Sequence, residues 1–303
     1  MTRWTTADIP DQSGRVALVT GANSGLGFHT SLGLARRGAR VLMACRDAGR
    51  AEQALRRLRA EVPDATAELI SLDLASLDSV EAAARDVTAR TSSLDLLIDN
   101  AGIMAVPRGL TADGFERQLG TNHLGHFALT GRLLPLLLSA PAARVVVVSS
   151  GAHRMGQVRF EDLMGERSYG RWQAYAQSKL ANLLFARELE HRATGTSLVV
   201  AAAHPGYAAT HLQVGHGSAV QGAIMKVSNA VLAQSDAQGA WPSLYAATMP
   251  DVRTGDYWGP QLAELRGVPK RVGRSGAAGD DVTARRLWQV SEQLTGVSYP
   301  FSH

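Results

Sequence analysis

The sequence predicts an α/β fold built on a doubly wound parallel sheet, and three observations support this prediction. Apolar runs of four to six residues alternate with longer segments of helical periodicity. These runs are apolar without interruption, which is typical of parallel strands that helices cover on both faces. No linker is long enough to divide the chain of 303 residues. Right-handed crossovers would then give a single domain, residues 1–303, with a crevice at the carboxyl ends of the strands.

The first elements follow from short runs that end at glycine. The run VALVT at 16–20 is rich in β-branched residues and ends at Gly21, so it reads as a buried strand. The segment 28–37 has helical periodicity, and Gly38 is a typical stop. The same reasoning predicts strands at 41–45 and 67–72 and helices at 48–61 and 78–91.

The later elements are less regular. Strands are predicted at 94–98, 145–149 and 197–203, and helices at 113–138 and 172–190. Pro135 is expected to bend the last turn of the first of these helices. After Ala208 the pattern loosens into glycine-rich and turn-forming segments, among them 215–222, 254–256 and 271–281. We therefore expect a mobile C-terminal quarter.

Charge and composition indicate an ordinary globular protein. The net charge of +4 comes almost entirely from arginine, because the chain has three lysines, Lys179, Lys226 and Lys270. The arginines are densest at 50–59, where nearby glutamates suggest a solvated helical face. Nucleic acid is therefore not an expected partner.

Cysteine content and the N-terminus bear on location. Cys45 is the only cysteine, so neither an internal disulfide nor a thiolate metal cluster is possible. The histidines have no spacing that converges with carboxylates on a metal, and none is predicted. The N-terminus is polar, and the longest apolar runs fall far short of the ~20 residues that span a membrane. We predict a cytoplasmic protein without a membrane anchor.

The segment TGANSGLG at 20–27 joins the first strand to the first helix. Glycines at this place let the backbone turn sharply and approach a pyrophosphate, whose charge then lies at the helix N-terminus. Three glycines at spacings of four and two favour a nucleotide site, of Rossmann type, over a tight turn without a ligand. The expected cofactor residues here are Gly21, Asn23, Ser24, Gly25, Leu26 and Gly27.

The end of the second strand bears on the choice of nicotinamide cofactor. An acidic residue there would accept from the ribose hydroxyls and repel a 2′-phosphate. Cys45 stands at that position, eighteen residues beyond Gly27, and Arg46 follows it. A guanidinium can pair with a phosphate through two hydrogen bonds. Asp47 could instead bind the ribose, but we interpret it as a loop residue or helix cap and favour NADP(H) over NAD(H).

Two further segments follow strands at the same crevice. Asp73, next to Leu74, could accept from the adenine amino group or cap the helix that begins near Asp78. Asn100, Ala101 and Gly102 form a turn of small residues after the fourth strand. All except Asp78 are candidate cofactor residues.

Tyr175 and Lys179 are candidate catalytic residues because they lie four apart on a predicted helix, and so on one face. A tyrosine with a pKa near 10 is a poor acid or base at neutral pH. A nearby ammonium, together with an oxidised nicotinamide ring, favours the phenolate and lowers that pKa. A surface pair is the alternative, but Lys179 is one of few lysines, and an ammonium can also bind ribose hydroxyls.

Two polar residues complete the candidate site. Ser150 ends the fifth predicted strand and could bond a substrate carbonyl or cap a turn, and Ser149 competes with it. Asn122 lies inside the helix predicted at 113–138, where an amide is neither favoured nor explained by packing.

The motifs TGANSGLG, DNAG, TNHLGHF, VVSS and YAQSK follow one another in an order and spacing that resemble the short-chain dehydrogenases/reductases. Pro205 and Gly206 complete the set, and the resemblance is close over about 14–210. Within that family ACRD, YAQSKLANLLF and HPG are similar to the retinol dehydrogenase-like branch. The animal proteins of that branch often carry a membrane-anchoring N-terminal segment that this chain lacks, so retinoid handling at a membrane is not expected.

The resemblance implies a catalytic tetrad. Tyr175 would protonate the carbonyl oxygen as hydride leaves the nicotinamide, and Ser150 would hold that oxygen. Lys179 would bind the nicotinamide ribose and lower the tyrosine pKa, while Asn122 would hold a water in a proton relay. Asp99 replaces a more usual asparagine, which we expect to be tolerated. The other implied contacts to the cofactor are Arg46 to the 2′-phosphate, Asp73 to the adenine, Asn100 near the adenosine ribose and Thr210 at the nicotinamide amide, and Pro205 and Gly206 are further cofactor residues.

The resemblance also implies an architecture around the site. The C-terminal part, about 205–303, would form the substrate pocket and lid, with loops near 152–171 and 208–234 shaping it. Homo-oligomers could form through the helices predicted at 113–138 and 172–190.

The predicted function is an NADP(H)-dependent oxidoreductase that interconverts a carbonyl and an alcohol on an apolar small molecule. A non-catalytic dinucleotide-binding regulator on the same fold is the alternative, because fold does not fix function. A sugar-nucleotide epimerase or dehydratase fits the glycine spacing less well.

Overall fold

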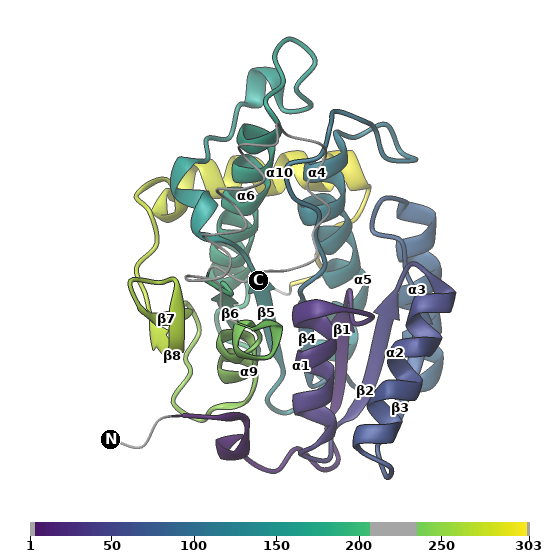
Figure 1. The fold of residues 1–303 in the computed structure, drawn as a ribbon. Helices are drawn as coiled ribbons and strands as arrows, with labels where there is room; N and C mark the ends of the chain where they lie inside the picture. Colours follow the sequence, from purple (N-terminus) through teal and green to yellow (C-terminus); the bar gives the residue numbers. More distant parts are fainter. Residues whose placement is uncertain (1–3, 207–234, 302–303) are drawn as a thin grey trace, which may run out of the picture.

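The computed structural model describes residues 4–206 and 235–301, and their strands form one eight-stranded sheet (Figure 1). Its order is β3-β2-β1-β4-β5-β6-β7-β8. The strands are β1 Val16–Thr20, β2 Arg40–Cys45, β3 Ala67–Ser71, β4 Leu96–Asp99, β5 Arg144–Val148, β6 Val199–Ala203, β7 Tyr257–Leu262 and β8 Arg266–Arg271.

The sheet is doubly wound, as the sequence predicted. Every pair from β3 to β7 is parallel, and the direction in which strands are added reverses between β1 and β4. Neighbouring residues of β1 serve opposite faces: Leu18 packs in one hydrophobic cluster and Val19 in the other. A crevice at the carboxyl ends of the strands is expected where the direction reverses.

Helices cover both faces of the sheet (Figure 1). One face packs against α1, α2 and α9, and the other against α3, α5, α6 and α10. Short 3₁₀ turns η1, η3, η4 and η5 lie at Thr6–Asp8, Gly151–Met155, Phe160–Asp162 and Ala277–Gly279. The helices are α1 Gly25–Ala35, α2 Ala48–Glu61, α3 Leu77–Arg90, α4 Arg117–Leu119, α5 Gly125–Ser139, α6 Arg171–Arg192, α8 Asp236–Gly239, α9 Trp241–Thr248 and α10 Asp281–Thr295.

The helix predicted at 113–138 differs from the observed one. It begins only at Arg117, because Gly114 adopts a φ of 83° and the Glu116 carboxylate caps the amides of Gln118 and Leu119. Between α4 and α5 the chain passes through a π turn, η2, at Gly120–Leu124. Such turns are rare and are frequently found at functional sites. Beyond it α5 continues past Pro135 to Ser139.

The loosened pattern after Ala208 did not predict the regular elements of residues 235–301, which form two short helices, two strands and a long helix. Gly259 and Pro260 lie inside β7 and Pro269 inside β8, so neither segment has the composition of a strand. β8 pairs antiparallel with β7 at the edge of the sheet, whereas only parallel strands were predicted. Proline and basic residues on an edge strand discourage pairing with other chains.

Helix α10 packs across α6 and α5 (Figure 1). The Trp288 ring stacks on Phe185 of α6 at 5.9 Å and meets Phe127 of α5 at 5.0 Å. Most residues of α5 and α6 are buried, and α10 covers part of the surface through which two copies could pair.

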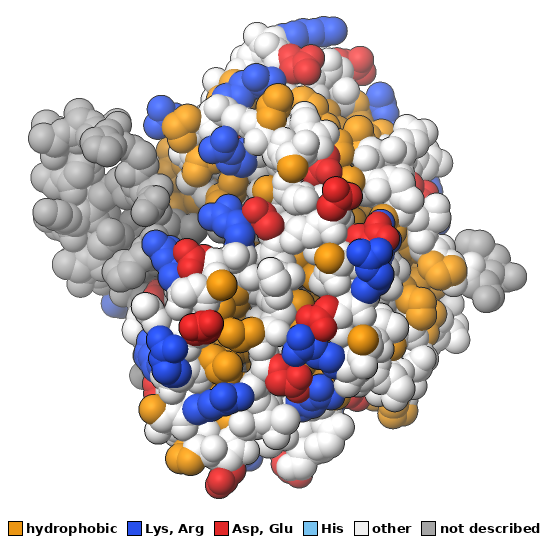
Figure 2. All heavy atoms as spheres, turned by 90° about the vertical axis from the view of Figure 1, so that its right-hand side faces the viewer, with side chains coloured by type: hydrophobic (Ala, Val, Ile, Leu, Met, Phe, Trp, Pro, Cys, Tyr) orange, Lys and Arg blue, Asp and Glu red, His pale blue; other side chains and the backbone are white. Residues whose placement is uncertain are grey.

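The arginines of the segment 50–59 lie on the outer side of α2, where they form intrahelical ion pairs. Arg56 lies 3.7 Å from Glu52, and Arg57 lies 3.3 Å from Glu61. Figure 2 shows this side of the molecule with basic and acidic side chains interspersed, which is the arrangement of a solvated face. Among the described helices, none is both long and apolar enough to cross a membrane.

Candidate active site

The glycine turn forms a cradle at the N-terminus of α1. Gly21 directly follows β1 with a φ of 67°, and Gly25 opens the helix with a φ of 52°. A Cβ on Gly27 would overlap the carbonyl oxygen of Gly21 and lie 2.6 Å from Asn100 Nδ2. Ser24, the N-cap residue, makes no side-chain bond to the helix amides. The cradle thus fits a pyrophosphate, because it presents amides at the positive end of a helix.

Asn100 fixes this cradle to the end of β4. Its side-chain amide donates to the Thr20 carbonyl at 2.8 Å, and its backbone amide donates to the Thr20 hydroxyl at 2.9 Å. The Ala101 amide donates to the same hydroxyl at 2.9 Å. A Cβ on Gly102 would lie 3.4 Å from Lys179 Nζ. The small-residue turn therefore joins the cofactor end of the site to the catalytic end.

Cys45 is the last residue of β2, so no carboxylate is present at that position. The Cys45 thiol is buried against the glycine turn, and burial raises its pKa to about 12 despite bonds from the backbone amides of Ala22 and Asn23. Asp47 caps α2, accepting from the Arg50 amide at 2.9 Å, which agrees with our interpretation of it. The Arg46 side chain is exposed, so its guanidinium is open to a ligand.

Asp73 is not the cap of α3, so that alternative is wrong. Ser76 caps the helix by accepting from the Ser79 amide, while Asp73 Oδ1 accepts from the Ala75 amide at 3.0 Å. Leu74 packs in the core, and a Cβ on Gly125 would overlap its carbonyl oxygen. The side chain of Leu74 is therefore not available to a cofactor.

Tyr175 and Lys179 lie one turn apart on α6, and both are buried, which excludes the surface-pair interpretation. Their side chains approach so that Lys179 Nζ is 5.9 Å from the centre of the Tyr175 ring. Nζ donates to the Val148 carbonyl at 3.1 Å, and burial lowers the Lys179 pKa to about 8. Burial raises the pKa of Tyr175, and a hydrogen bond with Ser150 partly offsets this. In this structure burial thus outweighs the lowering expected from the ammonium.

The two serines after β5 have separate environments. Ser149 is buried, and its hydroxyl donates to the Lys179 carbonyl at 2.8 Å, so it holds α6 in place. Ser150 is half-buried, bonds to Tyr175, and accepts from the Ala152 amide at 3.2 Å as the cap of η3. Ser150 can therefore cap the turn and still face a substrate carbonyl, so its two interpretations are compatible. Ser149 is not the serine that bonds with Tyr175.

Asn122 lies in the π turn, and its side chain is fully bonded to the protein. Its amide nitrogen donates to the Ile103 carbonyl and to the Ser178 hydroxyl, each at 2.9 Å. Its Oδ1 accepts from the Ile103 amide at 2.8 Å. Both N–H groups of the Asn122 side chain are occupied. A water bound to this side chain could therefore only donate a hydrogen bond to Oδ1.

A buried histidine that the sequence did not single out links these parts. His126 Nδ1 donates to the Asn122 carbonyl at 3.0 Å, so Nε2 must accept from the Thr20 hydroxyl at 2.9 Å. Burial lowers the pKa of His126 to about 4, which keeps the ring neutral. No pattern in the sequence could reveal this bond, because Thr20 and His126 are far apart in the chain.

The turn after β6 lies beneath the β7–β8 hairpin. Gly206 has a φ of 71°, and a Cβ there would overlap the Leu265 carbonyl oxygen. Its amide donates to His204 Nδ1 at 3.2 Å. Thr210, predicted beside the nicotinamide, lies outside the described residues, as does the whole loop 208–234.

A family model described as short chain dehydrogenase matches residues 15–220. The chain belongs to the short-chain dehydrogenase family. It is similar to retinol dehydrogenase 14 of Mus musculus, with 43% identity over 94% of this chain and 86% of the relative. It is also similar to retinol dehydrogenase 12 of Homo sapiens, with 40% identity over 94% of this chain and 88% of the relative.

Two solved structures agree with the fold. An uncharacterized protein of Mycobacterium paratuberculosis is 46% identical, with a TM-score of 0.80 over 99% of this chain and 100% of that one. Pseudomonas aeruginosa RhlG, solved as an active-site complex with NADP, is 26% identical, with a TM-score of 0.62 over 82% of this chain and 94% of that one. The protein is thus an oxidoreductase with the family's Rossmann-type fold.

Asp99, which departs from the family's usual asparagine, is fully buried at the end of β4. Its Oδ2 accepts from the Thr130 hydroxyl at 3.0 Å, and its Oδ1 has no partner among the described residues. Burial raises the pKa of this carboxyl to about 8, so it is mostly protonated at neutral pH. A protonated carboxyl is neutral and has nearly the shape of an amide, with one O–H donor and an acceptor oxygen, which explains how the fold accommodates it.

We expect Asp99→Asn to stabilise the protein most at high pH. Between about pH 4 and pH 8 the unfolded chain loses this proton while the folded chain keeps it, so wild-type stability falls as pH rises. The variant has no carboxyl at this position and does not lose stability in this way. Its free energy of unfolding, relative to that of the wild type, should therefore rise by on the order of 2 to 4 kcal/mol between pH 5 and pH 8. Urea unfolding at pH 5 and at pH 8 measures how much more stable the variant is than the wild type. Equal gains in stability at the two pH values would contradict the raised pKa of Asp99.

Proposed function

We propose that this protein reduces the carbonyl group of an apolar small molecule with NADPH, and runs the reverse oxidation, with Tyr175 as proton donor and acceptor. The observation that supports this most is the arrangement on α6. The Tyr175 hydroxyl bonds with Ser150, and Lys179 lies buried one turn away. The turn at Gly102 connects both to the pyrophosphate cradle.

In the proposed reaction NADPH, when bound, supplies a hydride to the carbonyl carbon. The Ser150 hydroxyl donates a hydrogen bond to the carbonyl oxygen, where negative charge develops. The Tyr175 phenol gives that oxygen its proton, and the raised pKa of Tyr175 keeps the phenol protonated before the step. Lys179 stabilises the phenolate that remains, and Asn122 holds the π turn against Ser178.

The proposed cofactor contacts extend around the crevice. Gly21, Gly25 and Gly27 would line the pyrophosphate, and Lys179 would bond the nicotinamide ribose. The Asn100 side chain supports the cradle by donating to the Thr20 carbonyl, and we propose that it lies near the adenosine ribose. The remaining proposed residues are Asn23, Ser24, Leu26, Asp73, Ala101, Gly102, Pro205, Gly206 and Thr210, with Leu74 contributing backbone only.

Preference for NADP(H) rests on Arg46. Its guanidinium is exposed, Cys45 is a buried neutral thiol, and Asp47 is engaged as a helix cap. No carboxylate at residue 45 would therefore repel a 2′-phosphate. The structure of the related RhlG with NADP supports the same choice.

Arg46→Ala should weaken the binding of NADPH much more than that of NADH. A hydrogen bond to a charged group contributes about 1.5 to 3 kcal/mol, which corresponds to roughly 10- to 100-fold in KM. KM for NADH should change little, because NADH has no 2′-phosphate. Arg56→Ala, an exposed arginine of α2 that pairs with Glu52, is the matched control and should leave both values unchanged. Equal loss for both cofactors would contradict the role of Arg46.

An apolar substrate is proposed from the rim of the site. Trp172 is 52% exposed and meets the Tyr175 ring edge-on at 6.1 Å. Met155 is 74% exposed on η3, the turn that Ser150 caps. The relatives named retinol dehydrogenases support an apolar alcohol or aldehyde. The C-terminal part, about 205–303, would supply the rest of the pocket, and its proposed lid lies largely outside the described residues.

A turnover screen tests the proposed function. Aldehydes, ketones and secondary alcohols should be offered with NADP(H) and with NAD(H), and we expect NADPH-dependent reduction of apolar carbonyls. Tight NADPH binding without turnover of any compound would instead favour the non-catalytic regulator. The predicted cytoplasmic location and homo-oligomerisation remain predictions.

A further inference from the structure

The turn η3 directly follows Ser150, and two consecutive side chains of this turn contact the C-terminal part of the chain. His153 Nδ1 bonds the Ser150 carbonyl at 2.7 Å, and the Ser275 amide donates to His153 Nε2 at 3.3 Å. Arg154 donates to the Gly273 carbonyl at 3.0 Å and pairs with Glu264 at 2.8 Å. The loop 272–275 therefore lies against the turn that carries Ser150.

The two bonds of His153 define its tautomer. A carbonyl oxygen only accepts and a backbone amide only donates, so Nδ1 carries the proton and Nε2 is the acceptor. Burial lowers the pKa of His153, which agrees with a neutral ring. The imidazole is thus a rigid bridge between the Ser150 carbonyl and the Ser275 amide.

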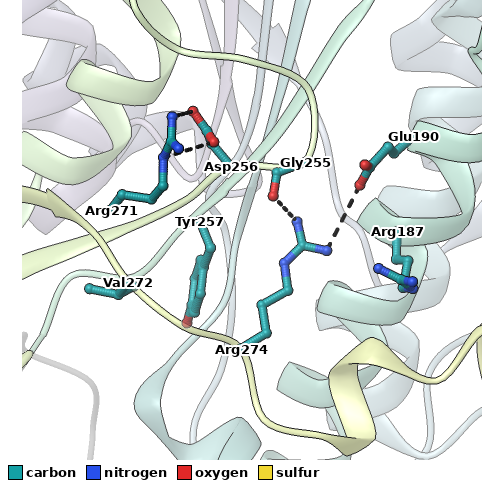
Figure 3. Close-up of a pocket in the computed structure, with 8 residues that line it drawn as sticks. All are labelled: Arg187, Glu190, Gly255, Asp256, Tyr257, Arg271, Val272 and Arg274. Carbon is teal, nitrogen blue, oxygen red and sulfur yellow. Dashed lines mark hydrogen bonds and ion pairs between the residues drawn. The ribbon is translucent and has the colours of Figure 1, made fainter.

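The loop itself is anchored at a charged pocket of about 200 Å³ (Figure 3). Arg274 donates to the Gly255 carbonyl at 2.8 Å and lies 3.9 Å from Glu190, as Figure 3 shows. The Val272 amide donates to the Tyr257 carbonyl at 2.8 Å. These bonds tie the loop to β7 and to the C-terminal half of α6.

This pocket is itself unsuited to bind an anion or a substrate. Arg271 pairs with Asp256 at 3.0 Å, and Arg187 pairs with Asp281 at 2.6 Å, so its other guanidiniums are already neutralised. Arg187 also lies three turns beyond Tyr175 on α6, about 18 Å along the helix axis. The pocket holds the loop in place.

Support from outside matters because η3 is a weak element. A five-residue 3₁₀ turn has poor hydrogen-bond geometry and little stability of its own. Ser150 is its cap, and the Ser150 carbonyl accepts from both the amide and the ring of His153. Displacing this turn would shift the Ser150 hydroxyl relative to Tyr175.

We propose that His153 is a positioning residue that holds Ser150 against the loop 272–275 and so aligns the serine hydroxyl with Tyr175. The loop 272–275, which we call the strap, is anchored by Arg274. The His153 imidazole links the position of the strap to that of Ser150. The inference rests on the proposed function, in which Ser150 holds the substrate oxygen.

Turnover with NADPH and a reducible carbonyl tests the alignment. His153→Ala should lower kcat roughly 10- to 100-fold, the range expected when a catalytic group moves by about 1 Å, with the Kd for NADPH within about twofold. His153→Asn keeps a donor to the Ser150 carbonyl and should recover part of kcat. His191→Ala, a histidine on the outer surface of α6, is the matched control and should be unchanged. An unchanged kcat in His153→Ala would overturn the proposal.

The strap is tested by a double-mutant cycle. Arg274→Gln should lower kcat in the same direction by loosening the loop. The double variant with His153→Ala should be no slower than His153→Ala alone, because both changes break one chain of contacts. Fully additive losses would contradict transmission through His153.

Hydrogen exchange separates this proposal from the proposed function, because it needs no turnover. With NADPH present, His153→Ala should exchange faster than the wild type in both 150–156 and 272–278. Ser150→Ala loses only the cap of η3, so it should exchange faster in 150–156 and like the wild type in 272–278. Unchanged exchange in His153→Ala would overturn the link, even in an active enzyme. A wild type that reduces no carbonyl would defeat the proposed function, and the exchange data would still decide the link.

Discussion

Tyr175→Phe should abolish most turnover while leaving NADPH binding nearly intact. The change removes the hydroxyl that bonds with Ser150 and keeps the buried ring that packs against Trp172. Proton transfer by a positioned side chain contributes typically about 10²- to 10⁴-fold to a rate, so kcat should fall by that range. Steady-state kinetics and fluorescence titration with NADPH measure the two effects separately.

Tyr245→Phe is the matched control for this experiment. Tyr245 lies on α9, and its hydroxyl donates to Asp251 at 2.9 Å near the surface. The same chemical change there should leave kcat and NADPH binding unaltered. If Tyr175→Phe kept the kcat of the wild type, another group would have to supply the proton.

Gly27→Ala is expected to weaken cofactor binding and stability together. The added Cβ would overlap the Gly21 carbonyl and approach Asn100 Nδ2 to 2.6 Å. Neither atom can move freely, because Gly21 belongs to the turn and the Asn100 amide is bonded to Thr20. Overpacking of this kind costs about 1 to 3 kcal/mol. Because the cradle must open to accept the methyl group, the Kd for NADPH should rise at least about tenfold, or ~1.4 kcal/mol.

Urea unfolding and NADPH titration check this expectation. Gly279→Ala is the control, because a Cβ there meets no atom within 4 Å. Its free energy of unfolding should change by less than about 0.5 kcal/mol, with NADPH binding unaltered. Wild-type NADPH affinity in Gly27→Ala would show that the cofactor does not use this cradle.

The sheet from β1 to β6 could be predicted because its signals are local. VALVT ends at Gly21, and the predicted helix at 48–61 coincides with α2. The C-terminal part could not be predicted in the same way. Gly259 and Pro260 are poor strand formers, and β7 forms because Ala202 and Ala203 of β6 offer it a partner edge. Helix α10 had readable signals, a cap at Asp280 and Gly296 at its end.

The candidate site divides in a similar way. Gly21, Gly27, Tyr175 and Lys179 could be found because their spacing within one turn or one helix carries the chemistry. The residues alone could not decide between Ser149 and Ser150, because the choice depends on which hydroxyl meets Tyr175, and Ser150 was predicted from the resemblance. His153 could not be singled out from the sequence, because its partner Ser275 is 122 positions away.

The most direct test of the proposed reaction follows the hydride itself. The wild-type protein is incubated with NADPH deuterated at C4 of the nicotinamide and with an apolar aldehyde or ketone, and the products are examined by mass spectrometry. We expect deuterium on the carbon that bore the carbonyl, with at least about a hundredfold less in Tyr175→Phe. Deuterium that never leaves the nicotinamide for any carbonyl, or equal transfer in Tyr175→Phe, would contradict the proposed function.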